Sequence, residues 1–120
     1  MWTAADRLGV TVRDLLSHSS GLPAYREFFR TRRGRLEFEA AICETRLEYQ
    51  PRTASVYSDL GFILLGFIVA GEFDLPTRFD TLLRQMGIVE DLQFSPPAHW
   101  RRRTAPTERD PFREIGRAHV

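Results

Sequence analysis

The strongest constraint on this chain is an uncharged, apolar run that fills residues 60–71, between Asp59 and Glu72. Three glycines interrupt the run, and it is shorter than the roughly 20 apolar residues that a helix needs to cross a bilayer. Because it is apolar on nearly every side, it predicts a helix from Ser58 or Asp59 to about Ala70 that neighbouring elements enclose. No transmembrane segment is predicted.

Helix signals flank this run on both sides. Residues 11–14 match a capping box with Thr11 as the N-cap, which predicts a helix that stops by Gly21. Thr77, with an acidic residue three positions later, predicts another N-cap. On the helix after Thr11, the side chains expected to face the core are Val12, Leu15 and Leu16. On a second helix, between the other two, they are Leu36, Ala40, Cys43 and Leu47. On the helix after Thr77 they are Phe79, Leu82, Leu83 and Met86. Beyond Gly87 we expect mostly extended or irregular backbone.

Composition excludes several classes of function. The chain has 120 residues with 17 basic and 16 acidic side chains, a net charge of +1 that demands neither a nucleic acid nor an anionic membrane as partner. Every basic residue is arginine, so these residues alone cannot run a mechanism that needs a lysine. Cys43 is the only cysteine, which excludes an internal disulfide and a multi-cysteine metal site, and it is expected to pack inside. The sequence carries no signal-peptide pattern, which leaves the compartment open.

Two stretches resemble segments of one enzyme family. Residues 11–23, TVRDLLSHSSGLP, closely resemble the T-x-R-x-L-L-x-H-T-S-G-L segment of the beta-lactamase-related serine hydrolases, which include class C beta-lactamases, DD-peptidases and esterases. Residues 51–62, PRTASVYSDLGF, resemble that family's P-G-x-x-x-x-Y-S-N-x-x-x segment. Order and separation also match, over residues 10–112. The resemblance implies an α+β fold, of which this chain would be a mainly α-helical fragment from the helical subdomain.

The resemblance also implies roles for two residues. In that family a Ser-x-x-Lys nucleophile, a Tyr-x-Asn element and a Lys- or His-Thr-Gly strand form the site. Tyr57 stands at the tyrosine position, whose phenol hydrogen-bonds the nucleophile and relays a proton to the leaving group. A phenol keeps its proton at neutral pH in water, so this role needs a neighbouring cation, which the family's lysine would supply.

Asp59 stands at the asparagine position of that element. Because an ionised carboxylate accepts hydrogen bonds but cannot donate one, this departure makes ester or peptide hydrolysis more plausible than beta-lactam turnover. Asp59 could also pair with the family's lysine, or cap the helix that follows it.

The resemblance further implies that residues 1–113 are part of a longer domain, without its nucleophile, lysine and third motif. We therefore expect the chain to be inactive alone, and to aggregate or form a compact state without a cooperative melt. The parent enzyme would cleave a small-molecule ester, peptide or beta-lactam through an acyl-serine intermediate, with no metal, organic cofactor, nucleic acid or membrane involved. Residues 114–120 equal the translation of a widely used sequencing adapter, and we interpret them as an artefact tail.

Other polar clusters have simpler interpretations. Residues 17–20 look like a Ser–His cluster around His18, but sequence neighbours rarely act as nucleophile and base, and the segment is structural in the family. His99 has no second ligand at metal spacing and is expected on the surface. Residues 101–103, all arginine, are expected to be solvated. A hypothesis from a different class remains, a small helical interaction protein that binds a partner through its Arg-rich segments.

Overall fold

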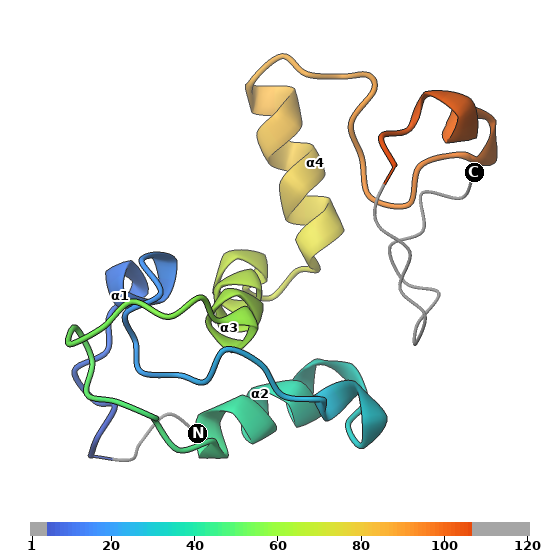
Figure 1. Ribbon diagram of the computed structural model, residues 1–120. Coiled ribbons are helices and arrows are strands. Elements are labelled where there is room, and N and C mark those ends of the chain that lie inside the picture. Colours follow the sequence, from blue (N-terminus) through green and yellow to red (C-terminus); the bar gives the residue numbers. More distant parts are fainter. Residues whose placement is uncertain (1–4, 107–120) are drawn as a thin grey trace. The chain divides into compact units, whose positions relative to one another are not determined.

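The computed structural model describes residues 5–106 (Figure 1). The chain divides into two compact units, with the boundary between Leu75 and Pro76. The helices are α1 (Val12–Leu16), α2 (Gly34–Glu44), α3 (Asp59–Ala70) and α4 (Leu75–Gln85), with short 3₁₀ helices at Phe28–Arg30 and Ala98–Arg103. No strand occurs within the described residues, which confirms a mainly helical chain. The predicted tail, residues 114–120, lies outside them.

The helix α3 organises the first unit, and its bounds are those predicted. It packs against both α1 and α2. The buried core consists of Leu15, Leu22, Ile42, Cys43, Leu60, Leu64 and Leu65. Ser58 is the N-cap, because its hydroxyl oxygen accepts a hydrogen bond from the backbone N–H of Gly61 at 3.2 Å. Asp59 is therefore the first helical residue, and the interpretation of it as the cap is wrong.

The expectation that neighbours enclose α3 is also wrong for the described chain. Phe62, Ile68 and Val69 are 48%, 55% and 57% exposed. Within residues 5–106, only the helices α1 and α2 pack extensively against α3, and α1 is five residues long. The other side of α3 therefore keeps large apolar side chains in contact with water.

The first helix begins as predicted and ends early. Thr11 and Asp14 form the capping box, in which each side chain accepts a hydrogen bond from the other residue's backbone N–H. The helix ends at Leu16, and the backbone N–H of Ser19 donates to the Asp14 carbonyl at 2.8 Å. This closing turn places His18 in the left-handed region, at φ 55°. Histidine thus takes the place that the sequence suggested for glycine.

Gly21 does not end the helix, contrary to our prediction, but allows two chain segments to approach closely. Its φ is 91°, and a Cβ atom there would lie 2.3 Å from the carbonyl oxygen of Tyr49. The missing side chain lets two chain segments approach, and the backbone N–H of Glu48 donates to the Gly21 carbonyl at 2.8 Å.

The predicted core face of α1 is only partly right. Leu15 is buried, whereas Val12 and Leu16 are exposed. A helix of five residues turns little more than once, so it can direct few side chains at α3.

The helix α2 buries its last turn instead of the predicted stripe. The buried residues are Ala41, Ile42 and Cys43. Leu36 is 82% exposed and Ala40 is exposed, because the N-terminal part of α2 extends beyond the core. Leu47 still packs on the core, but from the segment after Glu44, where the helix has ended. Cys43 is buried as predicted.

In α4 the predicted N-cap is wrong. The helix begins at Leu75, so Thr77 lies inside it, where its carbonyl accepts from the hydroxyl of Thr81 at 3.0 Å. Pro76 permits this earlier start, because the first turn of a helix needs no N–H donor and proline is preset for helical φ.

The predicted inner face of α4 is partly exposed. Leu83 is buried, and the half-buried ring of Phe79 meets the ring of Phe94 edge-on at 5.2 Å. Leu82 and Met86 are exposed.

The end of α4 follows a common pattern. Gly87 has a φ of 76°, and the backbone N–H of Ile88 donates to the Leu83 carbonyl at 2.8 Å. Beyond it the described backbone is irregular as predicted, except for the 3₁₀ helix Ala98–Arg103. Within residues 5–106 no single helix is long and apolar enough to cross a membrane; only α3 and α4 counted together reach that length and hydropathy.

The exposed side of α3 predicts self-association. Each large apolar side chain left in water forgoes about 1.5–3 kcal/mol of burial, so contact between copies is favourable. We expect the purified chain to bind a hydrophobic dye and to sediment as associated species at micromolar concentration, and Val69→Arg to weaken both. Ala54→Arg, which adds the same charge at another exposed position, is the control. A dye-free monomer would contradict this prediction.

Candidate functional site

The two motif-bearing parts of the chain are held together by backbone hydrogen bonds. We call residues 17–24 the first segment and residues 48–59 the second segment. The N–H groups of the second segment donate to carbonyls of the first as follows: Glu48 to Gly21, Arg52 to Ser19 and Asp59 to Ala24 at 2.8 Å, and Val56 to His18 at 2.9 Å. The second segment is thereby fixed along its length, up to the start of α3.

Side chains add to this pairing. The Ser58 hydroxyl donates to the Pro23 carbonyl at 2.7 Å, and the Ser55 hydroxyl donates to the Ser17 carbonyl at 2.9 Å. The Tyr49 hydroxyl donates to the His18 carbonyl at 3.0 Å. These bonds satisfy carbonyl groups that belong to no regular element.

An ion pair ties the second segment to the start of α1. Nη1 of Arg52 lies 2.6 Å from Oδ2 of Asp14 and also donates to the Gly9 carbonyl at 3.1 Å. The pKa of the Asp14 carboxyl is lowered, chiefly because it accepts the backbone N–H of Thr11, with further help from the Thr11 hydroxyl and the Arg52 charge, while burial acts in the opposite direction. The capping box of α1 is therefore also an anchor for the second segment.

The predicted site residues lie at the end of this fixed segment. Tyr57 is 71% exposed and Asp59 is exposed, whereas Ser58 between them is only 2% exposed. The Tyr57 ring rests against the ring of His18, with centroids 4.8 Å apart. Asp59 lines a groove of about 860 Å³ on α3, together with apolar side chains such as Phe62 and the charged residues Arg35, Glu72 and Asp74. The structure thus leaves both predicted residues accessible, and their catalytic roles stay a prediction.

The cluster of residues 17–20 does not form a Ser–His pair in the described chain. The Ser17 hydroxyl bonds the Arg13 carbonyl and the Ser19 hydroxyl, both at 2.8 Å. Nδ1 of His18 instead accepts the backbone N–H of Ser58 at 3.0 Å. Sequence reasoning missed this contact, and no local pattern signals it, because the two residues are 40 positions apart.

The polar residues described in the second unit lie on its surface or pair with one another. His99 is exposed beside Trp100, as predicted. The guanidinium of Arg103 pairs with Asp91 at 2.5 Å and lies 5.2 Å from the centre of the Trp100 ring, while Arg101 and Arg102 are exposed. Over residues 5–106, no three His, Cys, Asp or Glu side chains lie close enough together to hold a metal ion.

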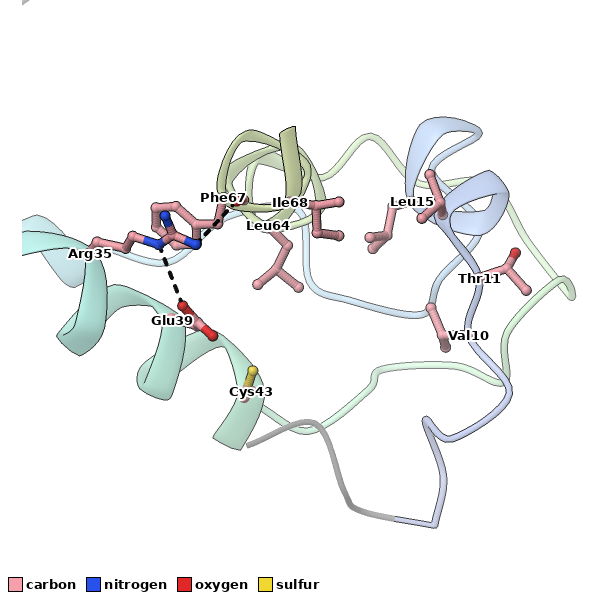
Figure 2. Close-up of a pocket in the computed structure, with 10 residues that line it drawn as sticks. Val10, Thr11, Leu15, Arg35, Glu39, Cys43, Leu64, Phe67 and Ile68 are labelled. Atoms are coloured by element: carbon pink, nitrogen blue, oxygen red, sulfur yellow. Dashed lines mark hydrogen bonds and ion pairs between the residues drawn. The ribbon is translucent and has the colours of Figure 1, made fainter. Parts of the chain in front are cut away.

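A second, mostly apolar pocket lies among α1, α2 and α3. It has a volume of about 290 Å³, and Figure 2 shows the Cys43 thiol, Leu64 and Phe67 around it. Arg35 and Glu39 form an ion pair of 3.7 Å beside it. Burial raises the pKa of the Cys43 thiol.

The amino-acid sequence matches one known family. The sequence model of the family described as Beta-lactamase matches residues 2–118, almost the full chain. Comparison with curated proteins and with solved structures gave no match.

The raised pKa of the Cys43 thiol predicts that it is alkylated slowly in the native chain. The thiolate is the reactive form, and a higher pKa leaves less of it at pH 8. We expect iodoacetamide to alkylate the native chain more slowly than the chain in urea, and the native rate to rise only at higher pH. Leu64→Ala, which opens the pocket, should raise the rate, and Leu36→Ala on the exposed part of α2 should not. Equal rates with and without urea would refute the prediction.

Proposed function

The chain belongs to the Beta-lactamase family, and on this basis we propose that it carries the tyrosine-bearing part of a serine hydrolase site that works through an acyl-serine intermediate. The observation that supports this most directly is the alternation at the end of the second segment. Ser58 is buried and hydrogen-bonded to Pro23, so Tyr57 and Asp59 on either side of it are exposed on a backbone that cannot shift freely.

Tyr57 is proposed as the group that exchanges a proton with the nucleophile and the leaving group. Such a group must be accessible to substrate and must keep its orientation between turnovers. The exposure of Tyr57 meets the first requirement, and the contact of its ring with His18 supports the second.

Asp59 is proposed to face the acyl portion of the substrate. It begins α3 beside the groove of about 860 Å³, which offers apolar surface for the rest of a small-molecule substrate. An ionised carboxylate cannot donate a hydrogen bond to an amide carbonyl, so an ester is a better candidate than a beta-lactam. The same carboxylate could accept a hydrogen bond from a lysine.

The nucleophile and its lysine are proposed to come from outside these residues. The 120-residue sequence contains no lysine, so no Ser-x-x-Lys element can form within it. In the proposed reaction the serine oxygen attacks the substrate carbonyl, the leaving group takes a proton, and water then releases the acyl group.

The first prediction of this proposal is that the 120-residue chain has no hydrolase activity. Catalytic groups that act as a unit lose most of the rate when one is missing. Nitrocefin and p-nitrophenyl acetate should disappear no faster with the chain than in buffer, and Tyr57→Phe and the control Tyr25→Phe should give the same rates. Turnover that falls in Tyr57→Phe alone would show that the chain is complete enough to act.

A further prediction concerns a longer enzyme in which this sequence is joined to a Ser-x-x-Lys element. We expect it to prefer esters over beta-lactams, and Asp59→Asn to shift the ratio of kcat/KM values towards the lactam by roughly two- to tenfold, the effect of one added hydrogen bond. Asp80→Asn, an exposed carboxylate on α4, is the control. An unchanged ratio would mean that Asp59 does not contact the acyl group.

A further inference from the structure

His18 contacts three consecutive residues of the second segment. Its carbonyl accepts the backbone N–H of Val56 at 2.9 Å, and its Nδ1 accepts the backbone N–H of Ser58 at 3.0 Å. Between these two bonds, its ring meets the Tyr57 ring at 4.8 Å with an angle of 37° between the planes. His18 therefore binds the backbone on both sides of Tyr57 and also contacts the Tyr57 ring.

The hydrogen bond from Ser58 determines which nitrogen of the neutral His18 imidazole carries the proton. A backbone N–H can only donate, so Nδ1 must present a lone pair and the proton of the neutral ring lies on Nε2. The orientation of the ring follows from this bond together with its stacking on Phe62, at 4.8 Å and 26°. The surface that His18 offers to Tyr57 is therefore fixed.

The left-handed backbone conformation of His18 costs free energy, and the contacts of His18 with the second segment offset that cost. His18 occupies the left-handed position after α1 that Gly87 occupies after α4. Glycine adopts that conformation without a steric penalty, whereas a side chain makes it unfavourable. Such conformations persist where surrounding contacts outweigh the cost, and they concentrate at functional sites.

We propose that His18 is a positioning residue for Tyr57: it sets the orientation of the Tyr57 ring through the Nδ1 bond to Ser58 and direct ring contact, without touching substrate. This inference rests on the proposed role of Tyr57, but its geometry can be tested without any turnover.

Two variants separate positioning from stability. His18→Gly removes both the acceptor and the ring while providing the residue that the left-handed position favours, so the end of α1 keeps its preferred backbone. His18→Asn keeps an acceptor close to the place of Nδ1, tolerates the same φ and lacks the ring. Ser55→Ala is the matched control, because it removes a neighbouring bond between the same two segments.

The measurement is NMR on the full 120-residue chain with Val69→Arg as the common background, because that substitution is expected to weaken self-association; only three histidines and three tyrosines need labelling. We expect a single His18 tautomer with Nε2 protonated, and nuclear Overhauser contacts between the rings of His18 and Tyr57. In His18→Gly the Tyr57 ring signals should move to values of an averaging side chain, and the Ser58 amide should exchange on the order of fivefold to tenfold faster, as for the loss of one hydrogen bond. His18→Asn should restore the Ser58 protection but not the Tyr57 ring signals. Ser55→Ala should change neither.

Averaged tautomers in the background chain, including those of an unfolded chain, would overturn the inference. So would His18→Gly signals for Tyr57 and Ser58 that match those of the background chain, or a Ser55→Ala effect equal to that of His18→Gly. Failure of the proposed function has a different signature, because a longer enzyme without Tyr57-dependent turnover would leave these spectra as expected.

Discussion

The structure depends on the hydrogen-bonded pairing of two irregular segments. Backbone N–H and carbonyl groups that leave water need partners, and within the described residues no strand provides them for residues 17–24 and 48–59. The segments provide them for each other, and Gly21 permits the close approach because a Cβ atom there would collide with the Tyr49 carbonyl. The start of α3, its cap and the exposed Tyr57 all take their places from this pairing.

Arginines complete the ends of the short helices. The Arg7 guanidinium donates to the Cys43 carbonyl near the end of α2, and Arg35 donates to the carbonyls of Phe67 and Gly71 at the end of α3, at 3.1 and 2.6 Å. A guanidinium has five donors in a planar fork, so one side chain can serve several acceptors where an ammonium is less directional. Positive charge near a helix C-terminus is also stabilising, because that end of the helix dipole is partly negative. A chain whose basic residues are all arginine thus gains closure of helices that are too short to be stable alone.

The sequence predicted the features that have local causes. The capping box at Thr11 and the bounds of α3 depend on residues within a few positions, and both are confirmed. The stripe on α2 failed because its burial depends on where α3 lies, and the cap at Thr77 failed because Pro76 allows an earlier start. For the candidate site, the resemblance pointed to Tyr57 and Asp59, but not to the contacts of His18 and Ser58 that support them. Those contacts join residues far apart in the chain, which no pattern of neighbouring residues reveals.

The cap of α3 limits which amino acids can occupy position 58. Serine, threonine, aspartate and asparagine are usually interchangeable at an N-cap, because each offers an oxygen to the free N–H groups. Here the same Ser58 hydroxyl accepts from Gly61 and donates its own proton to the Pro23 carbonyl. Aspartate would satisfy the helix and place a second acceptor against that carbonyl in a buried space. Natural variation at this position should therefore be narrower than at other helix starts, and biased towards side chains that carry a hydroxyl.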